Sequence, residues 1–422
     1  MPLRKRSDSG TVPRMRLLPA LALTLAVPAV AQDAQEPPTP AAIVAAAPAS
    51  DWRAIDPADL LVMTLAPDRD GNSRRVVIQL MPPPLSQGWV GNIRTLARAH
   101  WWDGTTVYRV VDNWVAQWGD GEDDKANAKP LPEGLRAPVA PYTVDLETLG
   151  EYTQTEPEAL DPVQEARLAE LVDRLFDPTL SEAEHVVLTE RIERELGIAP
   201  TGEPSPRERL AMLSIDATQT RLTEQGWHDR DSYAPWVEFW NGWPIGNEDQ
   251  IHWEDDGGNT VADPGLQRPS WPLEAPYRIV DQSMFWPVHC YGSVGVARDL
   301  SPDTGTGAEL YAVIGHAPRA LDRNIAVVGR VIEGIEHLST LPRGRGDAGV
   351  YDKPELRVPI VSVRLGDELP EAEQPRFEYL EGESFARYVQ VRANRNDPFY
   401  TVAAGGVDVC NVQVPIRRVA GG

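Results

Sequence analysis

Sulfur ligands are scarce in this chain, which has only two cysteines, Cys290 and Cys410, among 422 residues. Neither cysteine lies at ligand spacing with any of the seven histidines, so we expect no metal site. An oxidising compartment would permit a disulfide between Cys290 and Cys410. Two buried thiols acting as small apolar side chains are equally compatible with the sequence, and both possibilities stay open.

Basic residues are few relative to acidic ones, 40 against 63, which gives a net charge of −23. A phosphate backbone would be repelled by such a chain, so we expect no nucleic-acid partner. Motifs for other chemistries are also missing, because the sequence contains no GxSxG elbow and no complete glycine-rich nucleotide motif. We therefore expect no cofactor.

Long apolar runs are missing except for one near the N-terminus. Residues 1–16 carry five basic side chains and precede "LLPALALTLAVPAVA", which ends in the small-residue pattern of Ala29 to Ala31. This arrangement predicts a signal peptide over residues 1–31. The apolar run is shorter than the roughly 20 residues of a membrane span. We therefore expect an exported protein, located in the periplasm, with no membrane insertion after the signal is cleaved.

The remaining sequence divides into five segments. Residues 32–50 are rich in proline and alanine and predict a flexible linker. Residues 51–120 and 286–366 contain short strands with a helix in each part, and they flank an acidic, partly helical insert at 121–285. Residues 367–422 form an extension whose packing the sequence does not indicate. Short strands with only two helices favour a closed β-barrel over an alternating α/β sheet.

The insert contains predicted helices and an aromatic patch. The segments "LDPVQEARLAELVDRLF" and "SEAEHVVLTERIERELG" combine capping signals with apolar stripes and predict a helical hairpin, and a third helix is expected after Ser205-Pro206. Trp236, Trp240 and Trp243 lie close together in a segment that we expect to be irregular. Packing is the favoured role for these indoles, with peptide or sugar binding as the alternative.

Three segments, in order, resemble the cyclophilin family of peptidyl-prolyl isomerases: "WWDGTTVYRVVDNWVAQWGD", "GSVGVARDLSPDTGTGAELYAVIG" and "LDRNIAVVGRVIEGIEHL". The resemblance covers residues 58–120 and 286–366 and is interrupted by the insert. It implies a mainly β fold, with a closed eight-stranded β-barrel, two capping helices and a substrate groove on the outer wall.

The resemblance also implies a site. Arg109 falls on the family's catalytic arginine. The positions matching the family's substrate-binding residues are Trp114, Val115, Gln117, Ala297, Glu309, Tyr311, Leu321 and Ile325.

Several of these positions depart from the family pattern. Glu309 replaces a glutamine, and Tyr311 stands where a phenylalanine that cradles the proline ring is expected. Ala320 and Ile325 replace a tryptophan and a histidine found in many members. The rim of the pocket is therefore altered relative to the family.

The residue types suit prolyl isomerisation, because a charged, rigid guanidinium can donate to the prolyl nitrogen once the amide is twisted. Trp114 and Gln117 are three residues apart and would face opposite sides of one strand. A bulge or irregular turn must therefore lie in this segment if both serve one ligand.

We expect an isomerase that acts on X-Pro bonds in exported polypeptides and assists envelope protein folding. A non-catalytic member that binds proline-containing peptides as a chaperone or scaffold is the alternative. A carbohydrate-binding module that uses the tryptophan patch is a third possibility.

Overall fold

The computed structural model describes residues 38–122, 126–140, 142–145, 148, 231–248, 283–393, 395, 399–402 and 406–419 with their side chains. Of residues 251–255, 260–261 and 277–281 it describes the backbone alone. The chain divides into Met1–Pro37 and Pro38–Gly422, and the described residues all belong to the second unit. The expected signal peptide and the three expected helices of the insert lie outside the described residues.

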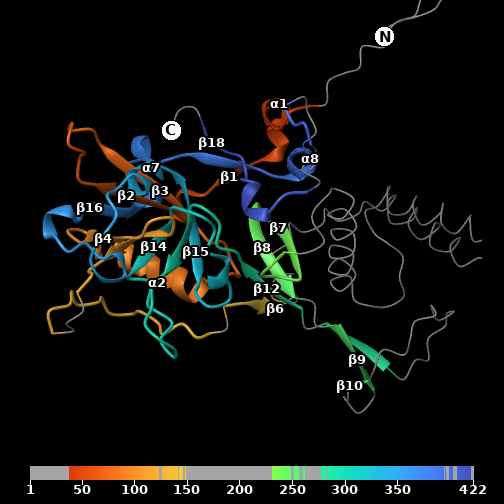
Figure 1. Ribbon diagram of the computed structural model, residues 1–422, viewed down its shortest axis with the longest axis horizontal. Coiled ribbons are helices and arrows are strands. Elements are labelled where there is room, and N and C mark those ends of the chain that lie inside the picture. The colour runs from red at the N-terminus through yellow and green to blue at the C-terminus, as the bar shows by residue number, and fades with distance from the viewer. Residues whose placement is uncertain are drawn as a thin grey trace, which may run out of the picture. The chain divides into compact units, whose positions relative to one another are not determined.

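Eight antiparallel strands close into a barrel in the order β13-β14-β5-β4-β16-β2-β3-β15. Figure 1 labels β2, β3, β4, β14, β15 and β16 of this barrel. The strands are β2 (Leu60–Leu65), β3 (Arg74–Leu80), β4 (Thr106–Val110), β5 (Val115–Gly119), β13 (Ser293–Val296), β14 (Leu310–Val313), β15 (Val327–Glu333) and β16 (Val358–Leu365). The mainly β fold with a closed eight-stranded barrel is thus confirmed. Both sequence segments that flank the insert contribute strands, so the barrel closes only when they come together.

Apolar side chains fill the barrel because each strand alternates between the inside and the outside. Trp118, Leu310 and Ile78 are among the buried residues of this core. Helix α2 (Gln87–Arg98) covers it with Ile93 and the other apolar residues of one face. The second expected helix, α7 (Glu336–Ser339), is only four residues long.

The expected flexible linker at residues 32–50 is wrong for its second half. Residues Pro40–Ala46 form helix α1, whose N-cap Thr39 accepts a hydrogen bond from the backbone N–H of Ala42 and whose first residue is a proline. Ile43 is buried in a cluster with residues of α8 (Gly382–Ala393). Burial of Ile43, with Val44 and Ala47 packed against the same cluster, holds a segment whose composition alone indicates a linker.

The C-terminal extension builds a small sheet beside that cluster. Strand β17 (Phe377–Leu380) pairs with β1 (Trp52–Ile55) on one side and β18 (Ile416–Arg418) on the other, all antiparallel. Cys290 and Cys410 are joined by a disulfide, which ties the start of the second barrel segment to the extension. Of the two possibilities left open by the sequence, the structure has the bonded one.

The described part of the insert contributes to a four-stranded sheet, which we call the insert sheet. Its order is β6-β12-β8-β7, and its strands are β6 (Val144–Asp145), β7 (Trp236–Trp240), β8 (Trp243–Glu248) and β12 (Met284–Pro287). The expectation of an irregular tryptophan segment is wrong, because β7 and β8 form a hairpin through Asn241 and Gly242, both with positive φ. Trp240 and Trp243 are buried, which agrees with the packing role.

Three further strands, β9 (Ile251–Asp255), β10 (Thr260–Val261) and β11 (Tyr277–Asp281), pair in the order β10-β9-β11. The short 3-10 helices are η1 (Ala49–Asp51), η2 (Pro57–Asp59), η3 (Arg319–Leu321), η4 (Asp347–Gly349), η5 (Pro354–Leu356), η6 (Gly366–Glu368), η7 (Glu371–Glu373) and η8 (Val409–Asn411). Within the described ranges, no helix has the length and apolar character that crossing a membrane requires.

Candidate active site

A row of residues crosses the outer wall of the barrel on four neighbouring strands. Arg109 of β4 is the register partner of Gln117 on β5, and Gln117 is the partner of Tyr311 on β14. Tyr311 in turn pairs with Gly295 on β13. Facing residues in antiparallel strands point to the same side of the sheet, so this row forms one continuous surface.

A β-bulge in β4 gives this surface an extra side chain. The register between β4 and β5 shifts between Val107 and Arg109, and both Val107 and Val110 belong to the barrel core. The two residues between them, Tyr108 and Arg109, therefore both face outward. The bulge explains how consecutive residues reach the same partner, because both of them hydrogen-bond to Gln117.

The guanidinium of Arg109 is held from two sides. Its Nε donates to the carbonyl oxygen of Ala348 at 2.7 Å, and its Nη1 donates to Oε1 of Gln117 at 2.8 Å. Its Nη2 makes no hydrogen bond to any residue that the structure describes. Burial lowers the pKa of Arg109, but a guanidinium remains charged at neutral pH. The side chain thus presents free N–H donors in a fixed orientation.

Behind Gln117 lies a chain of polar groups that ends in a carboxylate. Nε2 of Gln117 donates to the Tyr108 hydroxyl, which donates to Oε2 of Glu309 at 2.9 Å. Oε1 of Glu309 accepts from the backbone N–H groups of Asp120 and Gly121, at 2.8 and 3.3 Å. Burial raises the pKa of Glu309 above its ordinary value, although these hydrogen bonds act in the opposite direction. Burial, together with the neighbouring Glu309, also raises the pKa of Tyr108.

An apolar cluster adjoins the row, separate from the barrel core. Its buried members are Val115, Tyr311 and Val313. The partly buried side chains packed against them are Val111, Trp114, Ala297, Leu321 and Ile325. We call these eight residues the apolar cluster. A proline ring is a suitable ligand for such a surface, because it is compact and lacks an N–H group that would need a partner.

The structure brings the sequence-predicted site residues together. Arg109, Gln117 and Tyr311 form the row, and Trp114, Val115, Ala297, Leu321 and Ile325 lie in the apolar cluster. Glu309 reaches the row only through Tyr108. Ala320, at the altered rim, is exposed.

The expected irregularity is present in two places. Trp114 precedes β5 in a turn where its N–H donates to the carbonyl of Val111 and where Asn113 has φ of 52°. This turn releases Trp114 from the alternation of β5, as the sequence required. The β-bulge itself lies one strand earlier, at Tyr108 in β4.

Sequence reasoning missed Tyr108, Ala348 and His289. A bulge position has no local sequence signal, and Ala348 approaches Arg109 from 239 residues away. Ala348 has φ of 50°, a left-handed conformation that is costly for a residue with a Cβ and that directs its carbonyl to the guanidinium. The histidine, which contacts Tyr311, stands directly before Cys290 and could be suspected only from its position beside the second barrel segment.

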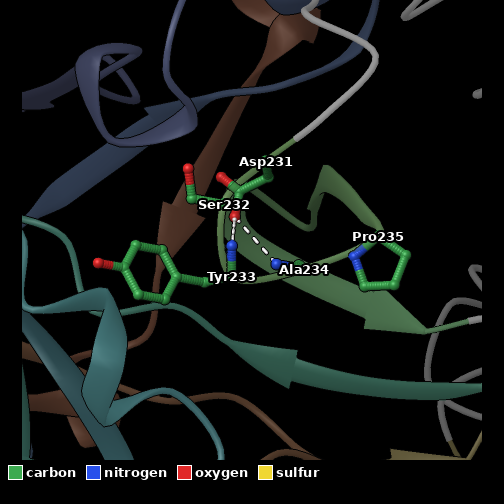
Figure 2. A pocket seen from close by; sticks show the side chains of 5 residues that line it. All are labelled: Asp231, Ser232, Tyr233, Ala234 and Pro235. Atoms are coloured by element: carbon green, nitrogen blue, oxygen red, sulfur yellow. Dashed lines mark hydrogen bonds between the residues drawn. The ribbon is translucent and has the colours of Figure 1, made fainter.

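No group of three or more histidine, cysteine or acidic side chains suited to a metal ion occurs among the residues with described side chains. A pocket of about 360 Å³ lies not at Arg109 but at Asp231, Ser232, Tyr233, Ala234 and Pro235 (Figure 2). These five residues are consecutive at the start of the described part of the insert, and their carboxylate and hydroxyls offer no arrangement of acid, base and nucleophile. The candidate active site is therefore formed by the row and the apolar cluster, and not by this pocket.

Part of the chain is similar to known proteins. Residues 248–365 match the family described as cyclophilin-type peptidyl-prolyl cis-trans isomerase/CLD. Among the solved structures that match is the cyclophilin AquaCyp293 from Hirschia baltica, at 18% sequence identity and a TM-score of 0.47 over 90% of this chain and 98% of that chain. The search of curated proteins finds no match.

The family match includes Ala297, Glu309, Tyr311, Leu321 and Ile325, whereas the row residues of β4 and β5 precede it. The barrel unites both groups, because β5 pairs directly with β14. Residues 248–365 thus match the cyclophilin-type peptidyl-prolyl cis-trans isomerase family, and the strands β2 to β5 that precede this match complete the same barrel.

Proposed function

We propose that the protein catalyses the cis-trans isomerisation of X-Pro bonds in polypeptides, with Arg109 as the catalytic residue. The observation that carries this proposal is the fixed guanidinium of Arg109 beside the apolar cluster, with Gln117 between them. The family match of the second barrel segment supports the same activity.

The reaction needs no covalent bond to break. The barrier to rotation, about 18–20 kcal/mol, arises because the amide nitrogen shares its lone pair with the carbonyl group. When the amide twists, the lone pair returns to the nitrogen, which becomes a hydrogen-bond acceptor. A hydrogen-bond donor that is already positioned at this nitrogen binds the twisted form better than either planar isomer and so lowers the barrier.

Arg109 meets this requirement because its position is set before a substrate binds. The contacts to Ala348 and Gln117 engage Nε and Nη1, and Nη2 is left for the prolyl nitrogen. The apolar cluster holds the ring, and the Gln117 amide lies where it can orient the peptide backbone. Rigid placement of a charged donor reduces the reorganisation that catalysis would otherwise require.

We further propose that the substrates are exported proteins and that the isomerase assists their folding in the periplasm. The sequence pattern of residues 1–31 is that of an export signal. The Cys290–Cys410 disulfide supports an oxidising compartment, where such bonds persist. Proteins that fold there contain X-Pro bonds whose isomerisation takes tens to hundreds of seconds without help.

A non-catalytic peptide-binding chaperone or scaffold is the second candidate. The observation that favours it is the altered pocket, in which Tyr311 replaces the expected phenylalanine and Glu309 adds a carboxylate behind Gln117. Such a protein would keep the apolar cluster for binding and would have no need of free donors on Arg109.

NMR exchange spectroscopy on a short Ala-Pro peptide distinguishes the two candidates. We expect the full chain to accelerate cis-trans exchange at catalytic concentrations. Peptide binding without faster exchange, found across several residues preceding proline, would favour the chaperone. If the protein neither binds the peptides nor accelerates their exchange, both candidates are excluded.

A further inference from the structure

The hydroxyl of Tyr311 has a buried partner that the proposed isomerase mechanism does not use. Its oxygen lies 2.9 Å from Nε2 of His289, and the two rings stack at 13° with their centroids 6.3 Å apart. Both side chains are buried, with His289 at 0% exposure and Tyr311 at 4%. A tyrosine whose hydroxyl is tied at one end has its ring plane fixed, and this ring belongs to the apolar cluster.

Both ring nitrogens of His289 are paired. Nδ1 lies 2.9 Å from Oδ1 of Asp322, which also accepts from the His289 backbone N–H at 2.9 Å. A carboxylate only accepts, so Nδ1 carries a proton and donates to Asp322, and Nε2 is paired with the Tyr311 hydroxyl. Every polar group in this pair of contacts is thereby satisfied.

The hydrogen bonds that begin at Tyr311 and His289 continue from Asp322 into the insert. Nε of Arg319 donates to Oδ2 of Asp322 at 2.5 Å. Nη1 and Nη2 of Arg319 donate to the two carboxylate oxygens of Asp231, both at 2.8 Å. The side chains of the Arg319–Asp231 pair are only 3% and 7% exposed, so water does little to weaken this ion pair. Arg319 lies on η3, which also carries Leu321 of the apolar cluster.

Asp231 is itself fixed to the turn that precedes β7 of the insert sheet. Its Oδ1 accepts from the backbone N–H groups of Tyr233 and Ala234, at 2.9 and 3.0 Å (Figure 2). The ring of Tyr233 lies 5.6 Å from the Arg319 guanidinium. Strand β7 begins at Trp236, directly after this turn. A residue of the insert is thus joined to the apolar cluster through buried, charge-assisted hydrogen bonds, which are stronger than neutral ones.

We propose that His289 is a positioning residue that sets the Tyr311 ring in the prolyl pocket, and that Asp322, Arg319 and Asp231 extend this control to the insert. The inference deepens the proposed function and rests on it, because the pocket it concerns is the one assigned to the proline ring. It gives Asp231 of the insert a role in substrate affinity that requires no contact between Asp231 and the substrate.

A double-mutant cycle tests the link between His289 and Tyr311. His289→Asn keeps an amide donor near Asp322 but is too short to reach Tyr311, and Tyr311→Phe removes the hydroxyl from the other end. For an Ala-Pro peptide we expect each variant to raise KM about five- to tenfold with kcat within about twofold, the effect of losing one hydrogen bond. The double variant should show the same rise as either single variant, whereas two effects that multiply would overturn the proposal.

A matched pair of insert variants tests the longer connection. Asp231→Asn removes the charge that faces Arg319 at nearly constant size, and we expect KM to rise about three- to tenfold. Glu248→Gln breaks another insert–barrel ion pair, with Arg323 at 2.6 Å, but this pair is exposed, and within the described residues neither side chain hydrogen-bonds to Asp322, His289 or Tyr311. The control should stay within about twofold of wild type. Equal KM changes in the two insert variants would overturn the proposed connection.

NMR of the full chain separates this inference from the proposed function. The NMR signals of the His289 imidazole proton and of the Tyr311 ring report on this hydrogen-bond network even when no substrate is turned over. We expect Asp231→Asn to shift both signals and Glu248→Gln to shift neither. If the wild type binds peptide but does not accelerate exchange, the proposed activity is wrong. The inference is then tested by the dissociation constants of the peptide, for which we expect the same increases in the variants as for KM. If His289→Asn does not fold, Tyr311→Phe and Asp231→Asn decide, and wild-type peptide affinity in both would overturn the inference.

Discussion

Arg109 faces Gln117 across the ladder between β4 and β5, and its Nη1 donates to Oε1 of Gln117 at 2.8 Å. The contact exists because the bulge at Tyr108 turns two consecutive residues of β4 to the outer wall. Tyr108 then accepts from the amide nitrogen of the same glutamine, so the amide is oriented from both ends. Gln117 therefore orients the guanidinium in addition to lying beside the apolar cluster.

Replacing Gln117 should impair the orientation of Arg109. Gln117→Leu keeps the approximate size but removes the acceptor, and we expect kcat/KM to fall about tenfold, with most of the loss in kcat because a misplaced donor weakens the transition state most. Steady-state kinetics by NMR exchange measures this. Gln117→Glu should also reduce kcat, because a carboxylate draws the guanidinium to itself. Wild-type kcat in both variants would exclude an orienting role.

Gly295 allows the Tyr311 ring to lie flat against β13. A Cβ at this position would overlap the hydroxyl end of that ring, so Gly295→Ala must displace it. We expect a loss of about 1–3 kcal/mol in the free energy of unfolding and weaker peptide binding. Gly91→Ala in α2 is the control, because no atom lies within 4 Å of its new Cβ, and it should stabilise by about 0.5–1 kcal/mol. Equal destabilisation by both changes would contradict the packing described.

Glu309 should make stability depend on pH in the mildly acidic range. Its pKa in the folded state is raised above the ordinary 4.5, mainly by burial, so the folded protein binds this proton more tightly than the unfolded chain does. The associated stability is complete below pH 4.5 and is lost as the pH rises through the folded pKa. Each unit of increase corresponds to about 1.4 kcal/mol.

Urea unfolding of wild type and Glu309→Gln at a series of pH values checks this sign. The stability of the wild type relative to the variant should fall as the pH increases from 4 to 7, because only the wild type must bury an ionised group there. Glu371→Gln, at a side chain that is 89% exposed, controls for the change in net charge. A wild type that gains stability over Glu309→Gln with rising pH would show that the hydrogen bonds outweigh burial.

The disulfide between Cys290 and Cys410 closes a long loop, since the two residues are 120 positions apart. Cross-linking such distant residues restricts the unfolded chain, so the Cys290→Ser/Cys410→Ser variant should lose about 2–5 kcal/mol in the free energy of unfolding. Denaturant unfolding with and without reductant measures the loss. Reductant should leave the stability of the double variant unchanged, and an equal response of both proteins would mean that the bond is not present in solution.

Much of the barrel and of the apolar cluster could be predicted from the sequence, because the alternation of strand residues and the order of motifs are both local signals. This alternation places Val115 and Tyr311 outside while Trp118 and Leu310 fill the core. The matched motifs then identify residues that lie together in the apolar cluster, although 183 positions separate Trp114 from Ala297 in the sequence.

The remaining features depend on contacts that have no local signal. Asp231 and Arg319 are 88 residues apart, and nothing in either segment indicates that they pair. Residues 40–46 have a linker composition and become helical because Ile43 finds a buried place against α8. The bulge at Tyr108 likewise appears in the pairing of β4 with β5 and has no local sequence signal.

The most direct test of the account is the catalytic rate for an Ala-Pro peptide with Arg109→Ala, compared with wild type by NMR exchange. Losing the donor at the prolyl nitrogen should lower kcat about a hundredfold or more, and Arg109→Lys, which keeps the charge but not the fork, at least about tenfold. Arg53→Ala, at an exposed arginine that pairs with Glu381 far along the chain, should keep the wild-type rate. Wild-type kcat in Arg109→Ala would contradict the assignment of this arginine as the catalytic residue.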